Sequence, residues 1–298
     1  MIRICQFITE LQPAGAERCV LELARRLPRE RFAVEVAALR GGAVADALRQ
    51  AGLPVHLLDV RGKWDLWRAR RLAAVLTKGH FDILHTHLFH ADFLGRWGAR
   101  RAGIPHVVNT VHVAEQRWRP WQFAWARLAA GGVDRIVCVS EGVRQFHSRR
   151  TGIPPEHYRV IYNGVDAAAY ARDEQLRQDR RKQWGIAPGE ILCAFVGRLD
   201  RQKGVDVLLS AFQAALPWCP ALRLVIAGDG PLRGQVETWK RNSPAGHLAH
   251  VLGRTDDVRG VLSAADIFCQ PSRWEGSAWR PPRRWRPACP LWPPMWRA

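Results

Sequence analysis

The sequence has no apolar run long enough to cross a bilayer. Its longest runs, such as residues 136–139 and 224–227, have only the length of a β-strand. The apolar run at residues 2–8 is too short for a signal peptide, and Glu10 follows it where a small-residue cleavage site would be needed. We therefore expect a cytoplasmic protein without a transmembrane helix.

Paired cysteines are also missing. The chain has seven cysteines, scattered along its length, with no C-x-x-C pair and no spacing typical of metal ligands. This pattern excludes a disulfide-stabilised secreted domain and a zinc-binding module. We expect these cysteines to be buried, reduced thiols.

Acidic residues are scarce. There are 27 Asp and Glu against 45 Lys and Arg, which gives a net charge of +18 over 298 residues. Such an excess attracts phosphates, nucleic acids or anionic lipid surfaces without distinguishing among them. The apolar fraction of 47% is otherwise that of a globular protein, and the length favours two domains.

Strand-like and amphipathic helical segments alternate over the first half of the chain, as in a parallel sheet covered by helices. The expected strands are residues 2–8, 33–38, 55–58, 83–85, 106–110, 136–139 and 159–161. The expected helices include residues 16–27, 43–51, 67–77 and 142–151. This pattern predicts an N-terminal Rossmann-like domain over residues 1–166.

A second series follows a polar stretch at residues 167–189, which we interpret as a linker with a short helix. Its expected strands are 192–196, 222–226, 251–252 and 267–269, and its expected helices are 205–216, 231–241 and 258–264. The fold class is thus α/β, with two Rossmann-like domains and a cleft between them that faces the carboxyl ends of both sets of strands. The second domain, residues 190–276, is incomplete.

Two loops could bind anions. Gly15 lies in a small-residue turn before a helix, where backbone amides can approach a phosphate, but the motif is weak and an ordinary strand–helix turn is the favoured alternative. Arg198, Arg201 and Lys203 lie between a strand and a helix, where cations suit a diphosphate leaving group. The alternative for the second loop is a solvated basic loop.

Two further motifs are weaker indications of a ligand site. The segment AGDGP at residues 227–231 resembles a dinucleotide fingerprint, but no G-x-G-x-x-G is completed, so a nicotinamide cofactor is disfavoured and a tight turn is the alternative. His85 and His87 form an H-x-H pair that lacks an obvious third ligand, so we expect no metal site. His112 follows a strand and could form a hydrogen bond with a sugar or a phosphate.

Nine motifs together resemble the retaining glycosyltransferases of family 4, which have the GT-B fold. In order, they are AGAER, HTHLFHADFLGR, NTVH, VSEGVR, VIYNGVD, FVGRLDRQKGVDVLLSAF, LVIAGDGPLR, VLGRTDDV and AADIFCQPSRWEG. The resemblance covers residues 2–276. It implies transfer of a hexosyl unit from a nucleotide-diphosphate sugar to a glycan or lipid-linked acceptor, with retention and without a metal or other cofactor. Synthesis of a cell-surface polysaccharide or lipopolysaccharide is the role expected by analogy.

The resemblance also implies roles for individual residues. His112 would contact the donor hexose, Arg198 and Lys203 would bind the diphosphate, and Glu275 would hold hexose hydroxyls as the first glutamate of an E-x7-E motif. Other positions are implied in donor binding: Gly15, which would offer its backbone to phosphate or acceptor, Gly197, and Val251 to Arg254, which would lie near the nucleobase.

The motif breaks after Glu275. The second glutamate of E-x7-E is replaced by Arg283, inside a tail at residues 277–298 in which 15 of 22 residues are Trp, Arg or Pro. If the codons from Ser277 onward are read one base earlier, a glutamate can replace Arg283. We interpret the tail as the product of a one-base deletion near the codon of Gly276, with a genuine variant tail as the alternative. We expect a truncated enzyme of impaired activity, with a marginal second domain that exposes apolar edges.

Two other functions remain open besides an inactive, truncated relic. The charge could serve a nucleic-acid-binding protein, but no binding motif is present and the basic residues are spread over helix faces. The segment 117–127 has three tryptophans and one phenylalanine among three arginines, which could dock on an anionic membrane. The alternative is a helix that packs its aromatic side chains into the first domain.

Overall fold

The computed structural model describes residues 1–60 and 66–276, with residues 66–69 described by their backbone alone. The chain divides into two compact units, Met1–Asn163 and Gly164–Ala298. The expected Trp/Arg/Pro tail, including position 283, lies outside the described residues. In the part of the chain that is described, no helix combines the length and apolarity needed to cross a bilayer.

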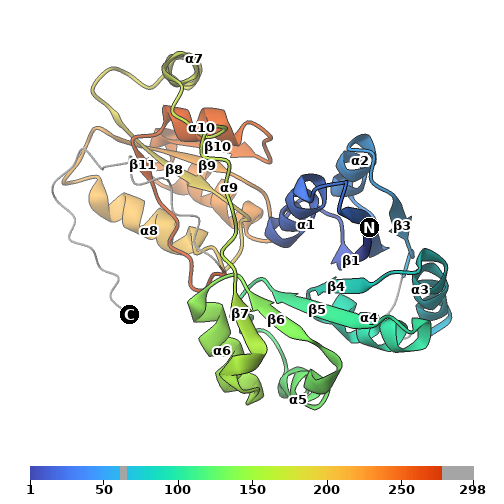
Figure 1. Ribbon diagram of the computed structural model, residues 1–298. Helices are drawn as coiled ribbons and strands as arrows, with labels where there is room; N and C mark the ends of the chain where they lie inside the picture. Colours follow the sequence, from blue (N-terminus) through green and yellow to red (C-terminus); the bar gives the residue numbers. More distant parts are fainter. Residues whose placement is uncertain (61–65, 277–298) are drawn as a thin grey trace. The chain divides into compact units, whose positions relative to one another are not determined.

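Unit 1 is built on a parallel seven-stranded sheet with the order β3-β2-β1-β4-β5-β6-β7 (Figure 1). Each strand that the sequence predicts for this unit is present. The strands are β1 (Ile2–Glu10), β2 (Phe32–Arg40), β3 (Val55–Leu57), β4 (Ile83–His87), β5 (His106–Val111), β6 (Arg135–Cys138) and β7 (Tyr158–Val160).

Helices cover both faces of this sheet, because successive side chains of a strand point to opposite faces. On β1, Ile8 packs in a cluster with side chains of α1 and α2, whereas Cys5 and Phe7 pack in another with side chains of α3 and α4. The helices are α1 (Gly15–Arg26), α2 (Ala43–Gln50), α3 (Leu66–Gly79), α4 (Phe89–Ala102), α5 (Pro120–Leu128) and α6 (Glu141–Thr151).

A buried polar network fixes α4 on the sheet. Arg96 and Asp92, both on α4, form an ion pair with side chains only 9% and 7% exposed. Asp92 also accepts from Thr86 of β4 over 2.8 Å, and Arg96 donates to the carbonyl of Ala129 over 2.6 Å. Each charge therefore has the partners that a buried charge requires.

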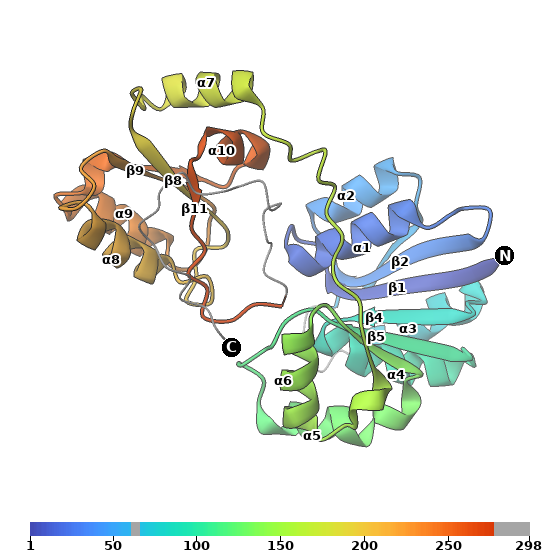
Figure 2. The same cartoon turned by 60° about the vertical axis from the view of Figure 1, so that its left-hand side comes forward.

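Unit 2 contains a parallel four-stranded sheet with the order β10-β9-β8-β11. Its strands are β8 (Ile191–Val196), β9 (Leu222–Ala227), β10 (Ala249–Gly253) and β11 (Ile267–Phe268), and its helices include α8 (Val205–Ala215), α9 (Arg233–Asn242) and α10 (Val258–Ala264). Figure 2 shows α8 and α9 on one side of this sheet and α10 on the other, in agreement with its two apolar clusters. Among the described residues, β11 is an edge strand.

The helix expected within the linker forms as α7 (Glu174–Gln183), and it is attached to unit 2. Arg177 and Arg181 bind the two carboxylate oxygens of Asp266 over 2.5 and 2.9 Å. Arg180 binds Asp257, the residue that caps α10, over 2.6 Å. These ion pairs attach α7 to the second unit. The pattern of apolar residues in the sequence does not predict this attachment, because charged side chains make it. Both units have the doubly wound α/β arrangement that the sequence predicts.

The buried network of α4 gives a testable prediction. We expect Asp92→Ala to lower the free energy of unfolding by about 3 kcal/mol, because it leaves the Arg96 charge buried without its partner. The matched control is Asp46→Ala on α2, where the ion pair with Arg49 is 71% and 48% exposed and we expect a loss below about 1 kcal/mol. Urea unfolding of the full chain measures both, and equal losses would contradict this role of Asp92.

Candidate functional site

The loops that follow the four strands of unit 2 lie side by side. The amide of Gly197, after β8, donates to the carbonyl of Ala227 over 3.0 Å, and that of Gly228 donates to Gly253 over 2.7 Å. The amide of Cys269, after β11, donates to a carbonyl of β8 over 2.9 Å. Parallel strands place their carboxyl ends at one edge, so five predicted donor-binding residues share this edge. They are Gly197, Arg198, Lys203, Arg254 and Glu275.

Glycines allow the close approach of these loops. A Cβ on Gly228 would lie 1.8 Å from the carbonyl oxygen of Gly197, and one on Gly204 would lie 2.0 Å from that of Pro271. Gly204 also has a φ of +69°, which favours glycine. The AGDGP segment is therefore a tight turn whose glycines bring the loops after β8 and β9 together.

Glu275 and Lys203 form the centre of a polar cluster at this edge. Lys203 Nζ lies 2.6 Å from Glu275 Oε1, and both side chains are about one-fifth exposed, at 23% and 21%. The same oxygen accepts from Ser272 Oγ over 2.6 Å and from Gln270 Nε2 over 2.9 Å. The cluster thus joins a cation from the loop after β8 to a carboxylate from the segment after β11.

Asp200 connects the two predicted diphosphate ligands. It forms an ion pair with Arg198, and its Oδ1 accepts from the backbone amide of Lys203 over 3.0 Å. The Asp200 side chain is 11% exposed, whereas that of Arg198 is 54% exposed. Asp200 therefore shapes the loop from within, while the Arg198 guanidinium faces solvent and can meet an anion.

The two ends of the 251–254 segment differ in their exposure to solvent. Val251, within β10, is half-buried against the apolar cluster that α8 and α9 cover. Arg254 follows the strand and is exposed at the sheet edge. The side chain of Arg254 is therefore the more accessible of the two to a ligand at this edge.

In unit 1, Gly15 and His112 both follow strands at the carboxyl edge of the sheet. Gly15 begins α1 directly after Ala14, which provides no side-chain cap. Apart from its chain neighbours and the backbone of α1, no described residue has a heavy atom within 4 Å of a Cβ added to Gly15, so the space beside Gly15 is open within the described part of the chain. His112 follows β5 directly and is half-buried.

His112 is the outer member of a hydrogen-bonded chain. Its Nε2 lies 2.9 Å from Nδ1 of His87, and Nε2 of His87 lies 2.6 Å from Oε1 of Gln6. The ring of His85 lies 4.2 Å from that of His87, and its Nε2 lies 2.7 Å from Oγ1 of Thr110. The H-x-H pair is thus held by neighbouring side chains, and the described residues contain no cluster of metal-ligating side chains that could hold an ion.

Burial keeps these imidazoles neutral near pH 7. Desolvation lowers the pKa of His85 to about 3 and that of His112 to about 4, and it holds the pKa of His87 well below its usual value. Electrostatic repulsion from His112 lowers the pKa of His85 further, and repulsion from His85 and His112 lowers that of His87. Each ring therefore has one N–H donor and one acceptor nitrogen.

The aromatic segment at residues 117–127 combines packing with exposure. Phe123 is 4% exposed, and the Trp118 ring lies 5.1 Å from it and 5.0 Å from Phe89. Trp121 is 54% exposed, and Leu128, at the end of α5, is 86% exposed. The alternative that α5 packs aromatic side chains into unit 1 therefore holds for Phe123. Trp118, which precedes α5, is half-buried, and Trp121 is more than half exposed although its ring lies 5.5 Å from that of Phe89.

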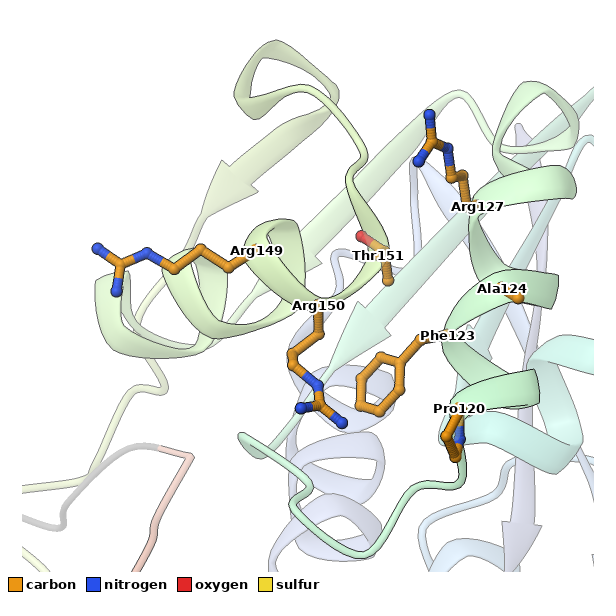
Figure 3. Close-up of a pocket in the computed structure, with 7 residues that line it drawn as sticks. All are labelled: Pro120, Phe123, Ala124, Arg127, Arg149, Arg150 and Thr151. Carbon is orange, nitrogen blue, oxygen red and sulfur yellow. The ribbon is translucent and has the colours of Figure 1, made fainter.

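Beside this segment, a groove of about 430 Å³ separates α5 from the end of α6 (Figure 3). Arg127, Arg149 and Arg150 line it, and Arg150 lies over the ring of Phe123 at 4.6 Å. These three arginines are exposed, and none forms an ion pair with another described residue. The groove therefore has a marked excess of positive charge.

Three residues that complete these clusters are not among those predicted from the sequence. Gln270 and Ser272 lie within the QPSRWEG motif, beside Glu275, and their polar side chains are the only signal. Gln6 is a polar residue inside an apolar strand, 1% exposed, which is the pattern of a buried hydrogen-bonding group.

The buried histidines give a prediction about pH. In the unfolded chain they bind protons below about pH 6.5, whereas in the folded chain they do so only near pH 4 or below, so acidification favours unfolding. Each should contribute a loss on the order of 1–2 kcal/mol between pH 7 and 5.

Urea unfolding of the full chain at these two pH values measures this loss, and His85→Gln should reduce the difference between them. The control His106→Gln changes an exposed histidine and should keep the wild-type pH dependence. The same pH dependence in all three proteins would contradict the assignment.

Comparison with known proteins identifies the family. The sequence profile of Glycosyltransferase Family 4 matches residues 13–169, and that of the glycosyl transferases group 1 matches residues 177–279. The UDP-Gal:alpha-D-GlcNAc-diphosphoundecaprenol alpha-1,3-galactosyltransferase of Escherichia coli is 27% identical over 276 residues, which is 88% of this chain and 71% of that protein. The alpha-monoglucosyldiacylglycerol synthase of Streptococcus pneumoniae is 30% identical, over 65% of this chain and 47% of that protein.

Solved structures agree on the fold. The structure of Anabaena Alr3699/HepE in complex with UDP-glucose has a TM-score of 0.77 at 21% identity, and the match covers 91% of this chain and 74% of that one. WaaG, a glycosyltransferase involved in lipopolysaccharide biosynthesis, has a TM-score of 0.66 at 14% identity, with 91% and 75% covered. The two Rossmann-like units are those of the GT-B fold, and the chain belongs to Glycosyltransferase Family 4.

Proposed function

We propose that this chain transfers a hexosyl unit from a nucleotide-diphosphate sugar to an acceptor, with retention of configuration at the anomeric carbon. The observation that carries the proposal is the cluster at the carboxyl edge of the second sheet. There Arg198 and Lys203 supply positive charge, and Glu275 supplies carboxylate oxygens. Cations and a carboxylate are what the two ends of such a donor require.

The reaction explains why both are needed. As the bond between the anomeric carbon and the diphosphate oxygen breaks, its electron pair goes to the diphosphate and the sugar becomes oxocarbenium-like. Arg198 and Lys203 would bind the diphosphate and stabilise its growing negative charge. We propose no metal or other cofactor, because these two side chains supply the charge.

The ion pair between Lys203 and Glu275 suggests an exchange of partners when the donor binds. A diphosphate carries more negative charge than one carboxylate, so it would compete for the Lys203 ammonium group. Glu275, still held by Ser272 and Gln270, could then accept hydrogen bonds from hexose hydroxyls. The pair would thus keep both charges satisfied until the donor arrives.

The remaining predicted residues complete the proposal. His112 would contact the donor hexose, and Gly15 would offer its amide to a phosphate or to the acceptor. Gly197 lies in the loop of Arg198, and its amide is occupied by the carbonyl of Ala227, so its role is to shape that loop. The nucleobase would lie near residues 251–254, where Arg254 has the accessible side chain.

We propose a glycan or lipid-linked acceptor and a role in cell-surface polysaccharide or lipopolysaccharide synthesis. The support is that the Escherichia coli relative acts on a diphosphoundecaprenol-linked sugar and the Streptococcus pneumoniae relative makes a diacylglycerol glycolipid, as their names state. An acceptor of this kind is found at a membrane, so we propose that the chain works at the cytoplasmic face of one.

A surface on unit 1 supports such a contact. We call it the α4–α6 surface, defined by its exposed apolar and basic side chains. They are Phe93, Trp97, Trp121, Leu128, Arg127, Arg149 and Arg150. Nucleic acid is the less suitable partner, because Trp118, the aromatic residue between Arg117 and Arg119, is half-buried and its ring already contacts those of Phe89 and Phe123.

The first prediction from this proposal concerns nucleotide binding. We expect Arg198→Ala and Lys203→Ala each to weaken binding of UDP or GDP to the full chain by about tenfold or more, because each removes a charge-assisted hydrogen bond to the diphosphate. Arg241→Ala, on α9, is the control with the same change of charge and should bind like wild type.

Isothermal titration calorimetry measures these affinities. Variants that bind as tightly as wild type would contradict the assignment of Arg198 and Lys203. A wild-type chain that binds neither nucleotide would contradict the proposed function and favour the alternative of an inactive relic.

The second prediction concerns membranes. Flotation with vesicles of phosphatidylglycerol and phosphatidylcholine should recover the wild-type chain, and Arg127→Glu with Arg150→Glu should lower its partition coefficient at least about tenfold. Arg25→Glu with Arg241→Glu makes the same change of net charge outside the α4–α6 surface and should have a smaller effect. Recovery that does not depend on the anionic lipid would refute the contact.

A further inference from the structure

Gln6, His87 and His112 lie on three neighbouring strands of unit 1. Gln6 is on β1, His87 ends β4, and His112 directly follows β5, in the part of the sheet order β1-β4-β5. Gln6 and His87 are each 1% exposed, whereas His112 is half-buried. The chain of side chains thus runs from the centre of the sheet to its carboxyl edge.

The hydrogen bonds determine where each proton is. Oε1 of Gln6 can only accept, so His87 must donate to it through Nε2–H over 2.6 Å. A neutral imidazole has one N–H, so Nδ1 of His87 carries a lone pair and accepts from Nε2–H of His112 over 2.9 Å. The Nδ1 of His112 is then left with a lone pair, and no described residue donates to it.

Neighbouring groups support this arrangement. The ring of His85 lies 4.2 Å from that of His87 and is itself held by Thr110 over 2.7 Å, which restricts rotation of the His87 ring. Burial favours neutral rings, as the lowered pKa values of all three histidines indicate. With neutral rings, the tautomer of His112 depends on Gln6, through His87.

We propose that Gln6 and His87 are positioning residues that hold His112 in its Nε2–H tautomer, so that its Nδ1 accepts a hydrogen bond from a hydroxyl of the donor hexose. The contact with the hexose rests on the proposed function, whereas the tautomer does not. A buried glutamine and a buried histidine cost free energy of desolvation that an apolar pair would avoid. In this proposal, the desolvated pair fixes the position of the proton on His112, at the edge of the sheet.

The direct test is the protonation of the imidazole nitrogens, measured by ¹⁵N NMR on the histidine-labelled full chain at pH 7. The expected spectrum shows His112 protonated at Nε2 and unprotonated at Nδ1, with the signal assigned from its loss in His112→Asn. A wild-type spectrum with the proton on Nδ1 of His112 would overturn the proposal without any variant at Gln6.

Two variants at Gln6 then test its control over His112. Gln6→Met has a similar length but no acceptor, so we expect His112 to become a mixture of tautomers. Gln6→Glu places a buried carboxylate beside His87, which favours the imidazolium form of that ring. Nδ1–H of His87 then donates to Nε2 of His112, so His112 should change to the Nδ1–H tautomer. An unchanged His112 signal in a folded Gln6→Met protein would show that Gln6 does not set the tautomer.

A kinetic measurement tests the contact with the hexose. With UDP-hexose as donor, Gln6→Met should lower kcat/KM on the order of tenfold and leave the Kd for UDP unchanged, since UDP has no hexose. Gln6→Glu, which moves the His112 proton to Nδ1, should lower kcat/KM in the same way. If the tautomer is as proposed but the wild-type chain transfers no hexose, the proposed function fails and the positioning remains. If transfer occurs and Gln6→Met does not change it, the contact with the hexose is refuted.

Discussion

Parallel pairing of β-strands is the constraint on which the rest of this structure depends. Because parallel strands have their carboxyl ends at one edge, the order of the strands brings residues that are distant in sequence together there. Lys203 and Glu275 are the clearest case, since they are 72 positions apart and form an ion pair. The pairing of β8 with β11 brings the two loops together, and Gly204 lets the segment at Pro271 approach closely.

The same constraint acts on unit 1, but there it arranges buried polar groups. Gln6 and His87 lie 81 positions apart and meet because β1 pairs with β4. On the opposite face of the sheet, Thr86 of β4 donates a hydrogen bond to Asp92 of α4 and so connects the strand to the helix. The hydrogen bond between Thr86 and Asp92 fixes a helix on the sheet. The hydrogen bonds from Gln6 through His87 connect the sheet interior to His112 at its edge.

The sequence predicts the strands of both sheets well, because each is a short apolar run bounded by turns. It predicts α4 poorly, and the reason is physical. Gly95 and Gly98 lower the helix propensity of this segment, yet packing favours them there. A Cβ on Gly95 would lie 2.6 Å from the side chain of Thr86, and one on Gly98 would lie 3.0 Å from that of Leu76, which is a tight contact. Tertiary packing, which a single sequence does not show, decides this helix. Sequence motifs likewise identify Lys203 and Glu275 one by one. The contact between them, and the hydrogen bonds that Gln270 and Ser272 donate to Glu275, depend on the order of the strands.

We propose that the edge of the second sheet binds a nucleotide diphosphate, and a crystal structure of the full chain with bound UDP is the decisive experiment. We expect the diphosphate to lie within hydrogen-bonding distance of Arg198 and Lys203. We expect Glu275 to be separated from the Lys203 ammonium group while it remains bound to Ser272. A diphosphate bound elsewhere, or one bound with the ion pair between Lys203 and Glu275 intact, would contradict this proposal.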